Sequence, residues 1–469
     1  MGLAAPSDLM LDVSRWQFAF TIAFHMTFPA ITVGLSVFLA ATYAMFMRTH
    51  KPIYLQIFRF WKKIFAVGFA LGVVAGTVIT FEFGLNWGPF AAATGPILGP
   101  IIGMEVVTAF FLEAGFVGVM LYGDGRVKER TMLICCSLVA LGTILSTTWI
   151  LSANSWMQTP AGYRFEDGQF VPENWWQVIF NPSFAWRFPH MLLAVLIAAA
   201  LLIAGVAAYY LVRGRAREFA RRTFSVALGV LALLLPIQLF VGDNIALQYI
   251  VPHQLPKLEA LEGNWDSTNT GYQLLVIPDQ DGQQNLWELS VPWFGSAIGA
   301  KDLSGNTPVP GLAMTPPEDQ PNMTASFYGF RAMFYGSMLI FIVAFGSVVL
   351  RLRRRLYRAT WFHKLVMWLT PVGVIAIIGG WVTAEAGRQP WVVYGQMRTE
   401  DGVSQLSEGA VIGSFVGFLL IYLTLFAVWL WYVIRQVKRG PEDVSVDEID
   451  PDPDPVRGSV AEPSTPVTP

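Results

Sequence analysis

The feature that most constrains this chain is a series of nine stretches of about twenty or more mostly apolar residues. They cover roughly residues 17–46, 65–85, 100–122, 131–152, 187–212, 223–242, 326–350, 364–385 and 409–434. About twenty apolar residues are what a helix needs to cross the hydrocarbon core of a bilayer. Lipid offers the backbone no hydrogen bonds, so a segment of this kind spans the membrane as a helix. The sequence therefore predicts an all-α integral membrane protein with nine transmembrane helices.

Basic residues indicate how these helices are oriented. Clusters of Lys and Arg follow the odd-numbered spans, as MRTHK with RFWKK, GRVKER, RGRAREFARR, RLRRRLYR and RQVKRG. Cytoplasmic connections carry such an excess of positive charge. We therefore expect the N-terminus outside, the C-terminus in the cytoplasm, and outer connections at about 86–99, 153–186, 243–325 and 386–408.

The connections divide the chain into four parts. Residues 1–242 hold six helices and residues 326–435 hold three, while residues 243–325 form one long outer loop rich in Pro, Gly, Asn and Asp. A connection of that length in a compact protein is usually functional. Residues 436–469 are acidic and rich in proline, which predicts a disordered cytoplasmic tail.

Composition excludes several classes of protein. Only 14% of the residues are charged, whereas soluble domains carry about 25%. The net charge of −2 argues against nucleic acid or another polyanion as a partner. Cys135 and Cys136 are the two cysteines and are adjacent, which excludes a disulfide framework, a CxxCH haem attachment and an iron–sulfur ligand set.

Four potential metal ligands share the outer half of the predicted membrane region. His25 and His190 lie within spans, and Met333 and Glu385 lie near the outer ends of spans 7 and 8. Imidazole with thioether is an axial pair for a low-spin haem, whereas a lone histidine or carboxylate leaves one coordination position open. Taken singly, a hydrogen-bonded buried histidine or a packed methionine is the plainer explanation. Together they predict a redox membrane protein, with too few histidines for a haem–copper oxidase or a four-histidine dihaem cytochrome.

Charged residues accompany these ligands. The stretch GWVTAEAGRQPW, residues 380–391, ends span 8 with Glu385, Arg388 and Pro390. Arg331 is two residues before Met333 and points about 200° away from it on a helix. A guanidinium can neutralise a haem propionate. The alternatives are a lipid phosphate for Arg331 and a simple interfacial charge pair for Glu385 with Arg388.

Span 3 contains two carboxyl groups, Glu105 and Glu113, in GMEVVTAFFLEAGF. They are eight residues apart, about 80° around an α-helix, so both can face one interior. Ionisable groups within a span mark proton or substrate paths. The pair predicts a proton relay, which Ser146, Thr147 and Thr148 could extend; a neutral carboxyl bonded to a neighbour is the plainer alternative. A proton-coupled transporter would also explain the pair, but not the collection of His, Met and Glu on the outer side.

Several motifs occur in order along the chain. They are SRWQFAFTIAFH, EVVTAFFLE, the stretch WILSANSWMQTPAG from Trp149 to Gly162, KLEALE in the long loop, and GRQPW preceded by Trp381 and Glu385. In these motifs the sequence resembles subunit I of the cytochrome bd-type quinol oxidases, from residue 10 to about 435. The loop between spans 6 and 7 resembles the short quinol-loop type, which includes the cyanide-insensitive branch.

The resemblance implies which residues bind haem. His190 and Met333 would be the axial ligands of the low-spin haem b iron. His25 and Glu385 would each ligate the iron of a high-spin haem, with no assignment of which haem is which. Trp381, one helical turn before Glu385, would lie between haems.

The resemblance also implies roles for charged residues around the haems and the loop. Three arginines would neutralise propionates: Arg15, Arg331 and Arg388. Lys257 and Glu262 in the long loop would bind and oxidise quinol. Glu105 and Glu113 would belong to the proton path to the oxygen site.

Three haems and two substrates follow from the same resemblance. The haems would be a low-spin haem b, a high-spin haem b and a haem d, whose place a haem b takes in some relatives. Quinol would be oxidised at the outer face and O2 reduced to water with cytoplasmic protons, which separates charge without pumping. The implied partners are a second membrane subunit and, in some assemblies, a small single-span subunit. The expected location is the bacterial cytoplasmic (inner) membrane, as a multi-pass protein.

Overall fold

The computed structural model describes residues 7–299 and 301–444. Nine helical segments in this part of the chain are long and apolar enough to cross a membrane, so the predicted fold class is confirmed. They are α1–α2 (Asp8–Thr49), α3 (Pro52–Leu85), α4–η1–α5 (Gly88–Tyr122), α6 (Glu129–Gln158), α8 (Phe184–Arg213), α9–η2–α10 (Arg217–His253), α13 (Met323–Leu352), α14–α15 (Thr360–Ala386) and α17 (Glu408–Arg439).

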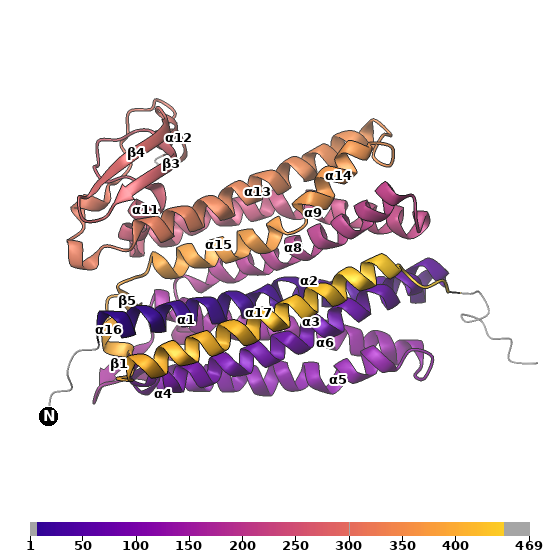
Figure 1. The fold of residues 1–469 in the computed structure, drawn as a ribbon, viewed down its shortest axis with the longest axis horizontal. Helices are drawn as coiled ribbons and strands as arrows, with labels where there is room; N and C mark the ends of the chain where they lie inside the picture. The colour runs from indigo at the N-terminus through magenta and orange to yellow at the C-terminus, as the bar shows by residue number, and fades with distance from the viewer. Residues whose placement is uncertain (1–6, 300, 445–469) are drawn as a thin grey trace, which may run out of the picture.

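Successive spans run in opposite directions, so their connections alternate between two faces of the protein (Figure 1). The loop face, at the left of Figure 1, holds the start of α1 and the long connection of residues 254–322. The basic face, at the right, holds the Lys- and Arg-rich connections and the end of α17.

Four spans are composite. Proline starts a new helix in two of them, because it has no N–H to continue the previous one: α1 (Asp8–Thr27) gives way to α2 (Pro29–Thr49), and α14 (Thr360–Leu369) is followed after Pro371 by α15 (Val372–Ala386). The other two contain π-helical turns. These are η1 (Val106–Phe110), between α4 (Gly88–Glu105) and α5 (Phe111–Tyr122), and η2 (Ala246–Ile250), between α9 (Arg217–Ile245) and α10 (Val251–His253).

The helices extend further than hydropathy predicts. Residues 88–99, which we expected in a connection, form the first part of α4, and α6 continues to Gln158. The long connection is shorter than residues 243–325, because α10 ends at His253 and α13 begins at Met323. Polar residues and glycines at the membrane edge lower the local hydropathy without ending a helix. Of the predicted tail, residues 436–439 belong to α17, and residues 445–469 lie outside the described residues.

The loop face carries the extramembrane structure (Figure 1). It comprises the antiparallel hairpins β1–β2 (Tyr163–Glu166 and Gln169–Pro172), β3–β4 (Tyr272–Asp279 and Gln284–Val291) and β5–β6 (Trp391–Val393 and Met397–Arg398), with the short helices α7 (Trp175–Ile179), α11 (Leu255–Glu262), α12 (Phe294–Ile298) and α16 (Thr399–Gly402). The helix α11 holds the KLEALE motif and packs against α13.

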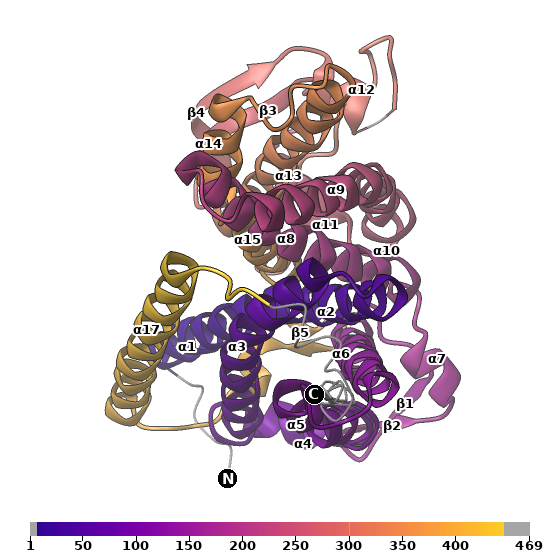
Figure 2. The same cartoon turned by 90° about the vertical axis from the view of Figure 1, so that its right-hand side faces the viewer.

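The spans form two groups in the end-on view of Figure 2. In the first, α8 packs on α9, α9 on α13, α13 on α15, and α15 on α8, so α8 and α13 occupy opposite corners of a four-helix arrangement. In the second, α1 packs on α3 and α17, and α4 and α5 pack on α6. Contacts of α2 with α3, α6 and α8 join the two groups.

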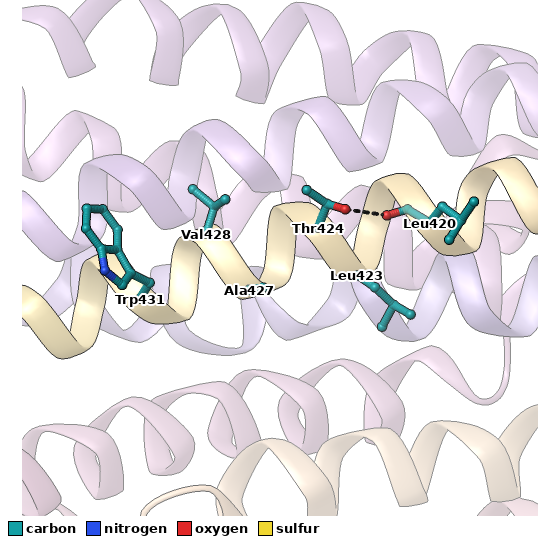
Figure 3. Close-up of a pocket in the computed structure, with 6 residues that line it drawn as sticks. All are labelled: Leu420, Leu423, Thr424, Ala427, Val428 and Trp431. Carbon is teal, nitrogen blue, oxygen red and sulfur yellow. Dashed lines mark hydrogen bonds between the residues drawn. The ribbon is translucent and has the colours of Figure 1, made fainter.

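The helix α17 has an apolar outer side with a shallow groove (Figure 3). The groove is lined by Leu420, Leu423, Thr424, Ala427, Val428 and Trp431. The single hydroxyl among these residues, that of Thr424, donates back to the Leu420 carbonyl at 2.7 Å, so this hydroxyl is not free to bind another molecule. It is a surface suited to lipid and contains none of the predicted site residues.

Candidate functional site

His190 and Met333 lie on the two helices at opposite corners of the four-helix group. His190 is the seventh residue of α8 and Met333 the eleventh of α13, which places them about 9 and 15 Å from the loop-face ends of their helices at 1.5 Å per residue. Two side chains from opposite helices at similar depth can meet a common group in the interior of the bundle.

Glycines make room beside both side chains. A Cβ atom at Gly242 of α9 would lie 3.2 Å from Cε1 of His190, and one at Gly380 of α15 would lie 2.7 Å from Sδ of Met333. The Nδ1 atom of His190 is buried and meets no hydrogen-bond partner in the described residues. Its Nε2 atom lies 3.5 Å from the side-chain amide of Gln238, at the limit of a hydrogen bond.

His25 lies at the interface of α1 and α3. A Cβ atom at Gly76 would lie 3.1 Å from its Cε1 atom, and Gly76 is about 14 Å from the loop-face end of α3 at 1.5 Å per residue. The imidazole faces the backbone of Gly72, although buried Nδ1 completes no standard hydrogen bond within residues 7–299 and 301–444. Contact between one ring nitrogen and a backbone carbonyl is the arrangement that leaves the other nitrogen for a metal.

Glu385 lies in the last turn of α15 and is held by several groups of the chain. Its carboxylate forms an ion pair with Arg388, one turn further on. The side-chain amides of Asn154 and Gln158, on consecutive turns of α6, donate to Glu385 Oε1 at 2.9 and 3.3 Å. Arg187 of α8 in turn donates to Asn154. The end of α15, where the GRQPW motif begins, is therefore tied to α6 and α8 through buried polar groups.

Gln158 connects this carboxylate to the long loop. The Lys257 Nζ atom donates to Gln158 Oε1 at 2.6 Å, and the Tyr249 hydroxyl lies 3.0 Å from the same oxygen. Gln254 donates to the Gln158 backbone carbonyl at 2.9 Å. Lys257 is only 2% exposed. Burial, followed by repulsion from Arg187, lowers the pKa of Lys257 well below its ordinary value.

Glu262 and Arg331 form a second buried pair between the loop and α13. Their side chains are 3.7 Å apart, and Arg331 also donates to the backbone carbonyls of Gln273, at 2.5 and 3.0 Å, and Leu261, at 3.3 Å. The guanidinium stacks over the rings of Tyr272 and Phe327 as well. Burial raises the pKa of Glu262, and Arg331 opposes this shift.

A hollow opens at the protein surface beside α11. Its volume is about 480 Å³, and it is lined by Leu255, Glu259, Ser267, Pro308, Pro310, Met314 and Thr315. Sites for small molecules commonly have about this size. Glu259 lies on the same short helix as Lys257 and Glu262, and its carboxylate accepts a hydrogen bond from Thr315 at 3.0 Å. Burial raises the pKa of Glu259.

Glu105 and Glu113 both face α6, with the π-helical turn η1 between them. Ser146 donates to Glu105 at 2.8 Å, and a Cβ atom at Gly142, one turn away on α6, would lie 2.6 Å from Glu113 Cγ. A π turn takes one extra residue, so the eight-residue separation corresponds to about seven α-helical steps and the two side chains differ by about 20° rather than the expected 80°. Of the three hydroxyls named earlier, those of Thr147 and Thr148 instead bond back to their own helix.

The remaining predicted residues are less closely tied to the others. The side chain of Arg15 is 41% exposed and lies 3.8 Å from Asp12. Trp381 is half-buried on α15, one turn before Glu385. Arg388 is buried, and its Nε and Nη1 atoms meet no partner in the part of the chain that the structure describes.

The residues of this site fit haem groups. Buried nitrogens without partners on His25, His190 and Arg388, and glycines beside His25, His190 and Met333, are what side chains that face a large planar cofactor require. Within the described residues no three His, Cys, Asp or Glu side chains gather to hold a bare metal ion. A haem iron does not need such a cluster, because the macrocycle supplies four ligands.

Several polar residues of the site were not predicted from the sequence. Asn154 and Gln158 lie in a motif that we quoted but did not interpret residue by residue, Arg187 is the first residue of a predicted span, and Tyr249 lies in the predicted long loop. Amides spaced four residues apart at the end of an apolar helix were the available signal, because they share one face of that helix. Glu82 was also missed, because it lies at the edge of span 2.

This chain resembles known proteins along most of its length. The profile of the family described as "Cytochrome bd terminal oxidase subunit I" matches residues 13–441. "Cytochrome bd ubiquinol oxidase subunit 1" of Bacillus subtilis is 30% identical over 448 residues, covering 93% of this chain and 95% of the relative. "Cytochrome bd-II ubiquinol oxidase subunit 1" of Escherichia coli is 30% identical over 511 residues, covering 94% and 98%.

A solved structure shares the fold. "The structure of bd oxidase from Geobacillus thermodenitrificans" superimposes with a TM-score of 0.82 at 26% sequence identity, covering 92% of this chain and 99% of that one. The residues that the family profile matches, 13–441, include all of the spans except the first few residues of α1, and the whole long loop. The chain therefore belongs to the family of subunit I of the cytochrome bd terminal oxidases.

Proposed function

We propose that this chain oxidises quinol at its loop face and reduces O2 to water in the interior of the membrane with protons from the basic face. The observation that carries this proposal is the hydrogen-bonded path from Lys257 in the loop through Gln158 to Glu385 at the end of α15. That path joins the predicted quinol site to a predicted haem ligand. The loop face is then the outer side of the cytoplasmic membrane, as the distribution of basic residues indicates.

Quinol is proposed to bind beside α11, next to the buried side chains of Lys257 and Glu262, and to enter from the surface hollow that Leu255 and Glu259 of the same helix line. Glu262 accepts a proton from the quinol hydroxyl, because its raised pKa makes it a better base near neutral pH than an exposed carboxylate. Arg331 holds Glu262 and the adjoining loop carbonyls in place. Lys257 is a hydrogen-bonding partner of the quinol. Because its pKa is lowered, its amino group gives up its positive charge readily and can bind a quinol oxygen in the neutral form.

The haem groups would be held by four side chains of this chain. His190 with Met333 would hold the low-spin haem b, and His25 and Glu385 would each hold a high-spin haem. When bound, these groups carry electrons and activate O2. The unpartnered donors of Arg388 are placed to pair with a propionate, while the Arg331 donors lie on the loop carbonyls and Arg15 lies near the surface.

Glu105 and Glu113 are proposed to pass protons inward from the basic face. Their common orientation toward α6 and the hydrogen bond from Ser146 to Glu105 support a short relay. Family membership favours this role over the proton-coupled transporter that the pair alone would allow. A second membrane subunit completes the enzyme and supplies part of the proton path; a small single-span subunit is a further expected partner.

A reduced-minus-oxidised visible spectrum of the purified complex, with extraction of its haems, tests the proposal. We expect b-type bands together with a red-shifted chlorin band from haem d. Three b-type haems without the chlorin band would keep the oxidase and replace haem d by haem b. A complex without haem would contradict the proposal and return the transporter as the better explanation.

The role of Glu262 has its own test. In Glu262→Ala with full haem content, we expect quinol turnover to fall about 10²- to 10⁴-fold, the usual contribution of a positioned general base. Glu288→Ala, which changes an exposed carboxylate on β4, is the matched control. Unchanged turnover in Glu262→Ala would show that another group accepts the proton.

A further inference from the structure

Glu82 is a buried carboxyl group that the proposed function does not use. It lies on α3, three residues from the loop-face end of the helix, and is only 1% exposed. Both of its carboxyl oxygens are buried, and neither finds a hydrogen-bond partner within the described residues. A carboxyl group in this condition is exceptional, because nearly all buried polar atoms in proteins are paired.

Glu82 belongs to a cluster of buried polar side chains between α1, α3 and α17. The Thr21 hydroxyl faces the carboxyl group of Glu82, and Tyr422 of α17 is close enough to interact electrostatically with that group. Nearby on α1 and α3, Ser14 and Asn86 are buried as well. The Thr21, Ser14 and Tyr422 hydroxyls and the Asn86 amide nitrogen also lack partners among residues 7–299 and 301–444. Such a concentration of unpaired donors and acceptors is suited to ordered water.

Among the described residues of α1, α3 and α17, no cation lies beside Glu82 as a fixed counter-ion. Near the loop face, Asp12 and Arg15 of α1 and Glu408 of α17 are exposed at the surface. The titratable groups on the inner side are Tyr422 and, deeper along α1, His25, whose ring packs against Gly76 two turns below Glu82 on α3. An ionised carboxylate without a counter-ion in this position would cost several kcal/mol.

We propose that Glu82 is a third proton-binding carboxyl group of the membrane region, which takes up a proton when an electron reaches the neighbourhood of His25. A positive charge near His25 would stabilise the ionised carboxylate. When one electron from quinol cancels that charge, a proton from the aqueous phase at the loop face forms an O–H bond at a carboxylate oxygen, and the proton returns to that phase when the electron leaves. Net charge in the interior is thereby conserved.

Glu82 is separate from the Glu105–Glu113 pair. That pair faces α6, whereas Glu82 lies between α1 and α17, on the loop-face side of His25. The inference rests on the proposed function for the source of the electron. Glu82 therefore compensates charge near His25 without belonging to the path that supplies protons for water.

Infrared difference spectroscopy of the purified complex, reduced minus oxidised, tests the inference directly. We expect a C=O stretching signal from a protonated carboxyl group in the reduced state, which moves to lower frequency in D2O. The signal should disappear in Glu82→Gln and persist in Glu113→Gln. Glu400→Gln, which alters an exposed carboxylate of α16, should leave it unchanged.

The visible spectrum of each variant separates the two proposals. If the haem bands are present and the infrared spectrum of Glu82→Gln matches the parent in the carboxyl region, the inference about Glu82 is wrong while the oxidase assignment stands. If Glu82→Gln does not assemble, Tyr422→Phe serves instead. Removing the neighbouring hydroxyl should shift the Glu82 signal, and an unshifted signal would also overturn the inference.

Discussion

Glu385 and His25 are both proposed haem ligands, but the chain holds them in opposite ways. The Glu385 carboxylate is paired with Arg388 and receives amide hydrogen bonds from Asn154 and Gln158. The His25 ring instead lies against glycine, with a buried nitrogen that has no standard partner in the described chain. His190 resembles His25 in both respects.

The difference follows from charge. A buried carboxylate costs several kcal/mol unless nearby groups compensate it, so the chain must provide a cation and donors before any cofactor arrives. A neutral imidazole has no charge that needs compensation, so it can lie in apolar surroundings before its ligand binds. We therefore expect changes around Glu385 to affect folding and assembly, and changes around the histidines to affect cofactor binding alone.

The largest effect is expected from His190→Ala. Loss of one axial ligand should remove the low-spin b-type band completely, while the protein still assembles, because no hydrogen-bond network depends on this ring. The visible spectrum and the size-exclusion profile of the complex measure both outcomes. His50→Asn, an exposed histidine with positive φ that asparagine tolerates, should change neither. A retained low-spin band in His190→Ala would contradict the ligand assignment.

Arg388→Leu should test the opposite behaviour at Glu385. Removing one partner of a buried ion pair leaves an uncompensated charge and typically costs about 3–5 kcal/mol. We expect a marked drop in thermal stability together with loss of one high-spin haem. Arg398→Leu removes the partly exposed pair with Asp319 on the same face, at 2.5 Å, and should cost about 0–1 kcal/mol. Equal losses of stability in the two variants would show that the buried Glu385 ion pair contributes no more to stability than the partly exposed one.

The pH dependence of quinol oxidation should report on Glu262. Its pKa is raised by burial, and the base must be deprotonated to act, so turnover should rise with pH through a midpoint above the ordinary carboxyl value. Arg331 lowers this pKa, so Arg331→Met should move the rising limb to higher pH. Arg164→Met, at the exposed hairpin β1–β2, is the control and should leave the limb in place. A limb that moves to lower pH in Arg331→Met would contradict the pairing.

The smallest effect is expected from Gly76→Ala. The added methyl group would lie 3.1 Å from the His25 ring and displace it slightly, which should shift the midpoint potential of one high-spin haem without loss of haem. Gly84→Ala changes the same helix where no atom lies within 4 Å of the new Cβ atom. It should stabilise α3 by up to about 1 kcal/mol and leave the potential unchanged. Redox titration of both variants distinguishes the two cases.

Much of the fold was predictable because lipid permits few backbone structures. Apolar length and the positions of Lys and Arg predicted nine spans and their alternation, and residues 7–299 and 301–444 hold nine helical segments of suitable length that alternate in direction (Figure 1). Hydropathy failed at span ends, as at residues 88–99, because helices continue beyond the apolar core. It also could not predict the π-helical turn at Val106–Phe110, which depends on packing against α6 and changes the relative direction of Glu105 and Glu113.

The site residues that could be predicted are those whose types are unusual in a membrane span, and the ones that could not are common polar types. Histidines and carboxyl groups in spans are conspicuous, so His25 and Glu385 could be named from the sequence. Gln158 and Asn154 are common residue types whose importance lies in which carboxylate and which lysine they reach. That depends on how α6, α15 and α11 meet, and the sequence pattern contains no such information.

Arg331 and Met333 share one turn of α13 and point to opposite sides of it. Arg331 holds two carbonyls and a carboxylate of the loop, while the Met333 side chain lies against α15. Because a helical turn is rigid, the loop and the methionine cannot shift independently. We therefore expect movement of the loop, on binding or releasing a molecule, to shift the methionine sulfur. With Met333 as the proposed iron ligand, the affinity of the loop and the electronic character of that iron would then change together.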